Sequence, residues 1–199
     1  MILVVGDSHT YGLGLRQCET NEHPPSPFAW PYQLDCAVEN IAYPGISNAE
    51  IAHRFIKTYD PSKHRATVIL WSFLSRIYHR HPVLDTLQSS TVQNLQTEWY
   101  FKNLYDDRVA NLELAAYVSL VNSISQGPVL HDFVDKTVST EILERLDINL
   151  VEPGCYFSLR KVWESQGALP GYYGHHLNEK AHKTWAQQYV QPALKRVGV

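Results

Sequence analysis

The first nine residues constrain the fold of this 199-residue chain more than any other segment. Residues 1–5 form a continuous apolar run rich in Ile and Val, which is typical of a parallel strand buried on both faces. Gly6, Asp7, Ser8 and His9 follow directly, and the small residue lets the chain turn sharply into a helix that begins near Ser8. We therefore expect a strand–turn–helix unit in a sheet whose two faces are both covered.

The rest of the chain alternates apolar strands with helices. Strands are predicted at 38–42, 66–71 and 129–133, and helices at 28–36, from Ser47 or Asn48 onward, at 108–125 and at 178–196. Strands separated by helices pair in parallel through right-handed crossovers. Because no repeat or linker interrupts the pattern, residues 1–199 are expected to form one domain. Its aromatic and polar segment 72–107 is expected to be an insertion that faces the substrate or a partner.

Composition excludes several classes of function. The 17 basic and 20 acidic residues give a net charge of -3, which provides no basic surface for nucleic acid or for a membrane. The apolar runs are too short to cross a bilayer, and no basic segment precedes residues 1–5, so we expect neither a transmembrane span nor a signal peptide. Cys18, Cys36 and Cys155 are odd in number and widely spaced, which favours a reducing compartment over a disulfide framework.

The turn after the first strand carries the first candidate for chemistry. A serine at position 8 would have its hydroxyl at the carboxyl edge of the sheet and its backbone N–H at the positive end of a helix. That placement suits a nucleophile whose carbonyl target becomes an oxyanion. The alternative is that Asp7 or Ser8 only caps the helix, because Ser and Asp are among the commonest caps.

The second candidate is His176, which stands just before the last predicted helix, with Asn178 as the expected cap. A loop histidine in this place can serve as the general base for a serine nucleophile. The chain has 10 histidines, so the position alone is weak support. The irregular spacing of His79, His81 and Asp85 favours a solvated loop, and we expect no metal and no cofactor.

Together these segments resemble the SGNH/GDSL hydrolase family. Residues 6–8 (Gly-Asp-Ser) match its first block, residues 40–48 (Asn-Ile-Ala-Tyr-Pro-Gly-Ile-Ser-Asn) resemble the second, and residues 176–178 (His-Leu-Asn) resemble the last. The resemblance spans nearly the whole chain and implies an α/β fold, a three-layer α/β/α sandwich with a five-stranded parallel sheet. The motifs are also similar to SGNH-like proteins of tailed bacteriophages, so a virion-associated location is expected beside a cytoplasmic one.

The resemblance also implies a set of roles. Ser8 would be the nucleophile and His176 the base, and the backbone N–H groups of Ser8 and Gly45 would hold the oxyanion. Asp7 and Asn48 would support the site. The reaction would be ester hydrolysis without a metal.

Two blocks depart from the family's pattern. After the third strand the family has Gly-x-Asn-Asp, whose asparagine side chain completes the oxyanion hole, but residues 71–76 read Trp-Ser-Phe-Leu-Ser-Arg. Ser72, Ser75 or Asn48 is expected to take the place of that donor. Loss of one oxyanion donor typically costs about 10²–10³ in rate.

The second departure concerns the acid that orients the histidine. The family has an aspartate three residues before the histidine, and Tyr173 occupies that position here. A backbone carbonyl or another acid, such as Asp132 or Asp135, is left to orient the His176 ring. Loss of the acid costs about 10⁴ in the serine proteases.

The motif set predicts a serine esterase acting on a small or carbohydrate-linked acyl ester, such as an acetyl ester. The only partner it implies is that substrate. The two departures leave open a catalytically impaired binding or structural module, for instance in a phage particle, because fold does not imply function. An acyl transferase using the same serine is a third possibility.

Overall fold

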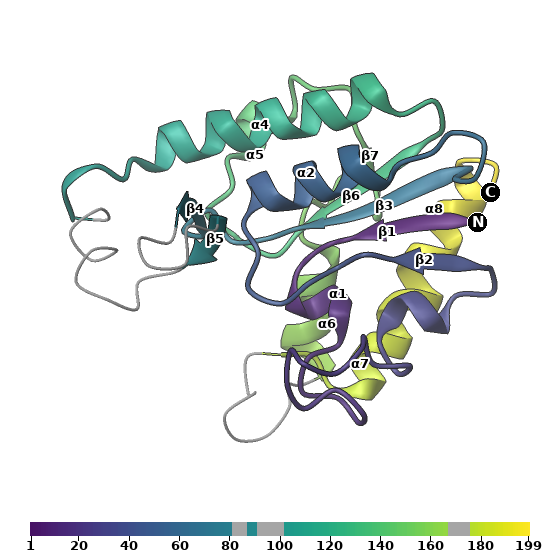
Figure 1. The fold of residues 1–199 in the computed structure, drawn as a ribbon. Helices are drawn as coiled ribbons and strands as arrows, with labels where there is room; N and C mark the ends of the chain where they lie inside the picture. Colours follow the sequence, from purple (N-terminus) through teal and green to yellow (C-terminus); the bar gives the residue numbers. More distant parts are fainter. Residues whose placement is uncertain (81–86, 91–101, 167–175) are drawn as a thin grey trace.

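The computed structural model of the chain describes residues 1–80, 87–90, 102–166 and 176–199. At its centre is a five-stranded sheet in which every pair is parallel, in the order β2–β1–β3–β6–β7 (Figure 1). The strands are β1 (Ile2–Val5), β2 (Val38–Asn40), β3 (Ala66–Trp71), β6 (Val129–Phe133) and β7 (Asn149–Leu150). This sheet confirms the predicted five-stranded α/β architecture.

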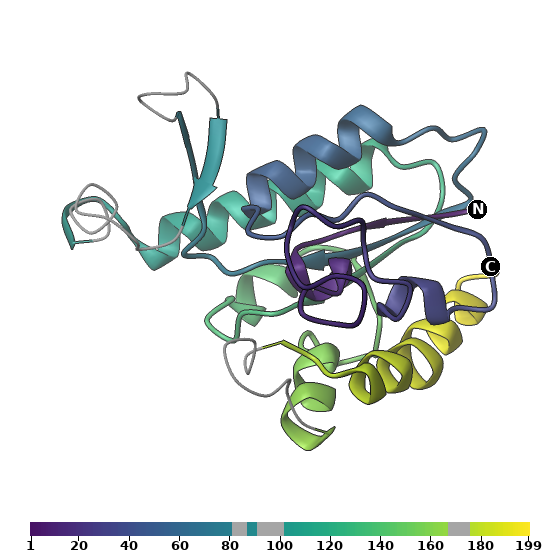
Figure 2. The same cartoon turned by 60° about the horizontal axis from the view of Figure 1, so that its bottom comes forward.

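Helices cover both faces of the sheet, as the two views in Figures 1 and 2 show. One face carries α2 (Asn48–Thr58) and α4 (Asp107–Ile124). The other face carries α6 (Ser158–Gln166), α7 (Glu179–Trp185) and α8 (Gln191–Arg196). Shorter helices complete the fold: α1 (Ser8–Tyr11), the 3₁₀ turn η1 (Trp30–Gln33), α5 (Thr140–Leu143) and the π turn η3 (Ala186–Val190).

The apolar run of β1 is explained by these two layers. Ile2 and Val4 pack into the core beneath α6, α7 and α8, whereas Leu3 and Val5 pack into the core beneath α2 and α4. All four side chains are fully buried. Because both faces of the strand are covered, there is no alternation of polar and apolar residues, as predicted.

Two predicted helices differ from the observed ones. The helix predicted at 28–36 is only the 3₁₀ turn η1, in which Pro31 lies near the start. The helix predicted at 178–196 is divided into α7, η3 and α8, and Pro192 lies in the first turn of α8. Proline cannot donate a backbone hydrogen bond to the preceding turn, and the π turn immediately before α8 accommodates this loss.

The segment after β3 contains a second, two-stranded antiparallel sheet formed by β4 (Ile77–Arg80) and β5 (Leu87–Ser90). It stands away from the five-stranded sheet in Figure 2. The predicted role of residues 72–107 as an insertion facing substrate or a partner stays a prediction. His81 and Asp85 lie outside the described residues, as does the side chain of His79.

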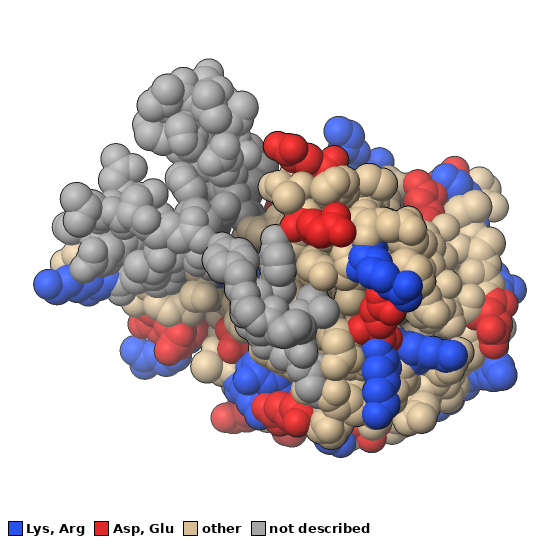
Figure 3. Space-filling model, turned by 90° about the horizontal axis from the view of Figure 1, so that it is seen from below, with Lys and Arg blue, Asp and Glu red and all other residues tan. Residues whose placement is uncertain are grey.

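No helix in the described parts of the chain is long and apolar enough to cross a bilayer. Figure 3 views the molecule from below, and on the described part of that face basic and acidic side chains are interspersed.

Candidate active site

The turn between β1 and α1 is shaped by close packing. A Cβ atom on Gly6 would lie 2.3 Å from Thr10 Oγ1 and 3.1 Å from the carbonyl oxygen of Leu70, so only glycine fits there. Asp7 caps α1, and its Oδ1 accepts a hydrogen bond from the His9 N–H at 3.0 Å. Ser8 is thereby fixed as the first residue of α1, at the carboxyl end of a central strand.

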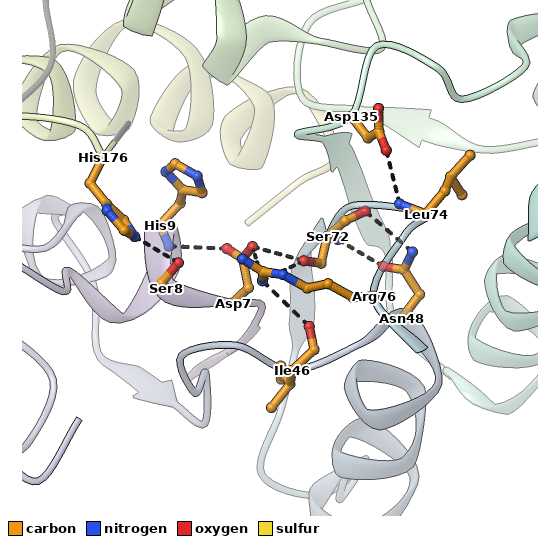
Figure 4. Close-up of polar contacts among 10 residues, drawn as sticks. All are labelled: Asp7, Ser8, His9, Ile46, Asn48, Ser72, Leu74, Arg76, Asp135 and His176. Carbon is orange, nitrogen blue, oxygen red and sulfur yellow. Dashed lines mark hydrogen bonds and ion pairs between the residues drawn. The ribbon is translucent and has the colours of Figure 1, made fainter. Parts of the chain in front are cut away.

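Ser8 and His176 meet across 168 positions of the chain. The distance between Ser8 Oγ and His176 Nε2 is 2.9 Å, and the two residues are only 3% and 4% exposed (Figure 4). His176 is held just before α7, where the Asn178 side chain accepts a hydrogen bond from the Ala181 N–H. A ring nitrogen at this distance can take the hydroxyl proton when it carries none itself.

Two further histidines, His9 and His182, lie close to His176. The ring of His9 is 5.0 Å from the ring of His176 and 5.5 Å from that of Trp163, measured between centroids. His182 Nδ1 accepts a hydrogen bond from the Trp30 N–H, and burial, followed by the proximity of His9 and His176, lowers the pKa of His182 to about 3. His182 is therefore neutral near pH 7, and the base lies in a buried, largely aromatic surrounding.

Neither acid suggested for orienting His176 is described in contact with it. The two carboxylate oxygens of Asp132 accept the N–H groups of Ser158 and Leu159, both at 2.9 Å. Asp135 accepts hydrogen bonds from Leu74 N–H and from Thr137, and Figure 4 shows it beside Leu74, far from His176. Asp132 thus binds the start of α6, and Asp135 binds the backbone of its own loop and of the turn after β3. Position 173, where the family has its acid, lies outside the described residues.

Ser72, expected to take the place of the missing oxyanion donor, forms hydrogen bonds within the protein. Its N–H donates to Asn48 Oδ1 at 2.7 Å, and its hydroxyl donates to Asp7 Oδ2 at 2.9 Å. Both donors are therefore engaged inside the protein, and the role of Ser72 as an oxyanion donor stays a prediction. Asn48 also donates through Nδ2 to the carbonyl oxygen of Ser72 at 3.2 Å, so its side chain fixes the turn after β3.

Gly45 lies in the turn after β2, where the family has its glycine donor. Its φ of +78° falls in the left-handed region that favours glycine, and a Cβ atom there would meet nothing within 4 Å. Backbone conformation, and not crowding, therefore accounts for glycine at this position. The roles of the Ser8 and Gly45 N–H groups as oxyanion donors stay predictions.

Arg76, which no sequence motif indicates, contacts Asp7, the neighbour of the candidate nucleophile Ser8. Its Nη1 donates to Asp7 Oδ2 at 2.8 Å and to Ser72 Oγ at 2.7 Å (Figure 4). Burial opposes ionisation of Asp7, but the Arg76 charge, the neighbouring His9 and the hydrogen bonds from His9 and Ser72 together lower the pKa of Asp7 below its ordinary value. In the sequence, Arg76 is a single arginine after a polar turn. Such a pattern is too common to indicate a functional role.

A pocket with a volume of about 280 Å³ opens beside Arg76, between the turn after β3 and helices α2 and α4. Ser8 does not line this pocket. Arg76 does, and its guanidinium also contacts Asp7, the neighbour of Ser8, so the pocket lies next to the Ser8 site. The lining is mixed, with polar groups from Ser47, Asn48, Arg76 and Glu113 and apolar walls from Leu74 and Leu114. In the described parts of the chain, no three acidic, histidine or cysteine side chains cluster as metal ligands.

The five-stranded parallel sheet with helices on both faces is an α/β fold of the kind found in SGNH/GDSL hydrolases. The structure is similar to that of TesA, with 17% identity, 98% of both chains covered and a TM-score of 0.57. It is also similar to the lipase/acylhydrolase from Enterococcus faecalis, with 13% identity, coverage of 98% of this chain and 96% of that one, and a TM-score of 0.58.

A third similar structure is that of a lipolytic protein assigned to the G-D-S-L family, from Desulfitobacterium hafniense DCB-2. The identity is 13%, 98% of each chain is covered and the TM-score is 0.50. No family model matches the sequence, and no curated protein matches it either. At these identities the likeness establishes the fold.

Proposed function

We propose that this protein is a serine esterase that hydrolyses small or carbohydrate-linked acyl esters through Ser8 and His176. The observation that carries the proposal is the 2.9 Å contact between Ser8 Oγ and His176 Nε2, buried at the carboxyl end of a parallel sheet. Helix capping alone would require no histidine on the serine hydroxyl. The fold shared with a lipase/acylhydrolase supports the same class of chemistry.

The reaction would run in two halves. Ser8 Oγ attacks the ester carbonyl while His176 Nε2 takes the hydroxyl proton, and the N–H groups of Ser8 and Gly45 bind the oxyanion. The tetrahedral adduct collapses to an acyl-serine, and His176 returns the proton to the leaving alcohol. A water molecule then repeats these steps and releases the carboxylic acid and free Ser8.

The pocket beside Arg76 supports a hydroxyl-rich substrate. Its lining combines a guanidinium, an amide, a carboxylate and a serine hydroxyl, from Arg76, Asn48, Glu113 and Ser47. Such groups donate to and accept from sugar hydroxyls, whereas a purely apolar pocket would favour a long acyl chain. We therefore favour an acetyl-type ester on a carbohydrate.

Labelling with a fluorophosphonate and turnover of p-nitrophenyl acetate test the proposal. Ser8→Ala should abolish labelling, and His176→Asn should lower kcat by at least about 10³-fold, because removal of a nucleophile or base has effects of this size. Ser123→Ala and His53→Asn, both exposed on helices of the opposite layer, are the matched controls. Labelling that survives Ser8→Ala would refute the assignment.

A second candidate function follows from the engagement of both Ser72 donors. A site with one oxyanion donor fewer could persist as a binding or structural module without turnover. A wild-type chain that neither labels at Ser8 nor hydrolyses short acyl esters would favour this candidate over the esterase.

A further inference from the structure

The guanidinium of Arg76 lies where three turns of the sheet meet. Its Nη1 donates to Asp7 Oδ2, to Ser72 Oγ and, at 3.5 Å, to the carbonyl oxygen of Ile46. The side chain is only 13% exposed, so these bonds form largely away from bulk water. One partly buried cation therefore holds the turns after β1, β2 and β3 together (Figure 4).

Each of these three contacts is next to a position of the expected oxyanion site. Asp7 precedes Ser8, Ile46 follows Gly45, and Ser72 opens the turn in which the asparagine of the family's pattern is missing. The cation thus stands among the three turns that would hold the oxyanion. The N–H and the hydroxyl of Ser72 are both engaged in hydrogen bonds within the protein.

The position of Arg76 matters because Asp7 carries a negative charge next to Ser8. Asp7 is fully buried, and its negative charge lies one residue from Ser8. Without a counter-charge that anion would oppose the negative charge that develops on the substrate carbonyl, because Coulomb interactions are strong where water is excluded. Arg76 forms a 2.8 Å ion pair with this carboxylate.

We infer that Arg76 is a positioning residue of the oxyanion site, and that it acts by cancelling the buried charge of Asp7 and fixing the three turns. It takes over, from a few residues further along the chain, part of the work that an asparagine performs in the family's third block. The inference rests on the proposed esterase function of Ser8 and His176.

The test compares the wild-type chain with Arg76→Met, Arg76→Lys and the double variant Asp7→Asn/Arg76→Met. Methionine keeps much of the length of the side chain without its charge, and asparagine is as good a helix cap as aspartate. Arg145→Met, an exposed arginine with a 78% exposed side chain, is the control. The measurements are kcat and KM for p-nitrophenyl acetate, the rate of Ser8 labelling by a fluorophosphonate, and thermal melting to verify folding.

Arg76→Met should lower kcat by about 10²–10³-fold, the range for loss of one oxyanion donor. KM should stay within about threefold, since the interaction acts on the transition state. Arg76→Lys should keep kcat within about tenfold of wild type, because a lysine retains the charge but lacks the guanidinium fork. The double variant should be at least about tenfold faster than Arg76→Met, because the charge that needs cancelling is gone.

Equal kcat in wild type and Arg76→Met overturns the inference, as does a folded double variant no faster than Arg76→Met. If Arg76→Met does not fold, the decision falls to Arg76→Lys and the double variant: a fall of about 10²-fold or more in both overturns the inference. A wild-type chain that does not react at Ser8 refutes the proposed function itself. A reactive wild type with an unaffected Arg76→Met refutes the role of Arg76 alone.

Discussion

Asp7 and Asp132 are two fully buried carboxylates, one just after a strand of the sheet and one within a strand, and their pKa values shift in opposite directions. Asp7 follows β1 and accepts the His9 N–H at the start of α1. Asp132 lies in β6 and accepts two N–H groups at the start of α6. The pKa of Asp7 is lowered, whereas burial raises the pKa of Asp132 to about 7.

The difference between them is the cation. Asp132 has two backbone N–H groups at 2.9 Å and no arginine or lysine among its described contacts, and desolvation dominates. Asp7 has Arg76 at 2.8 Å, and desolvation is overcome. The hydrogen bonds from Ser158, Leu159 and Phe133 do not offset the desolvation of Asp132, whereas the charge of Arg76, together with His9 and Ser72, offsets that of Asp7. The carboxylate that stays charged is the one beside the candidate nucleophile.

Removal of the Asp7 carboxylate should have the largest effect on stability. Asp7→Ala leaves Arg76 buried without its partner and removes the cap of α1, so the free energy of unfolding should fall by about 3–5 kcal/mol. Urea unfolding at pH 7, followed by tryptophan fluorescence, measures the loss. Asp147→Ala, an exposed aspartate, should change stability by less than about 0.5 kcal/mol. A loss below about 1 kcal/mol for Asp7→Ala would show that Arg76 reaches solvent and that the pair is not a buried one.

Asp132→Asn tests the other carboxylate and should have a smaller effect. An amide offers one carbonyl oxygen, so one of the two N–H groups at the start of α6 loses its acceptor, at a cost of about 1–3 kcal/mol. The loss should also depend on pH. Folded Asp132 holds its proton up to about pH 7, whereas the unfolded chain releases it near pH 4, so wild-type stability falls as pH rises through this window.

The measurement for Asp132 is the free energy of unfolding in urea between pH 4.5 and 8, for wild type and variant. The advantage of wild type over Asp132→Asn should shrink as pH rises. Asp7 has the opposite sign, because a lowered pKa stabilises the fold above its ordinary range and this contribution is lost on acidification. A difference between wild type and Asp132→Asn that does not change with pH would contradict the raised pKa and with it the contrast between the two acids.

The parts of the fold that could be predicted are those with a recognisable local sequence pattern. The strands β1 and β3 could be predicted because burial on both faces favours apolar runs. The strand β6 contains His131 and Asp132, and its place after Gly127 and Pro128 is what indicates it. The strand β7, Asn149–Leu150, has two residues and a polar member, so it has no periodicity to detect. The helix α6 was missed as well, although it supplies the N–H groups that Asp132 binds.

In the candidate site, too, residues in local motifs could be predicted and contacts between distant residues could not. Ser8 and His176 could be proposed because each lies in a local motif with a known order. The pairing of Asp7 with Arg76 joins positions 69 residues apart, and the Ser72–Asn48 bonds join positions 24 apart. A single sequence contains the residues of such pairs but not their proximity, so the hydrogen bond from the Ser72 hydroxyl to Asp7 could not be predicted.

Ser72→Ala should have the smallest effect on stability. It tests how far Asp7 depends on the hydrogen bond from Ser72 in addition to the ion pair with Arg76. Loss of the hydrogen bond from the Ser72 hydroxyl to the Asp7 carboxylate should reduce the free energy of unfolding by about 1.5 kcal/mol, the lower end for a bond to a charged group, because Arg76 still holds the carboxylate. The kcat for p-nitrophenyl acetate should stay within about fivefold of wild type, well short of the 10²–10³-fold loss of an oxyanion donor.

Ser75→Ala, the other serine of the same turn, is the companion variant. A 10²-fold or larger fall for Ser72→Ala alone would mean that the Ser72 hydroxyl turns from Asp7 to the oxyanion during the reaction. In that case Asp7 would lose the hydrogen bond from Ser72 in the transition state and keep its ion pair with Arg76. The contrast with Asp132 would then rest on that single guanidinium.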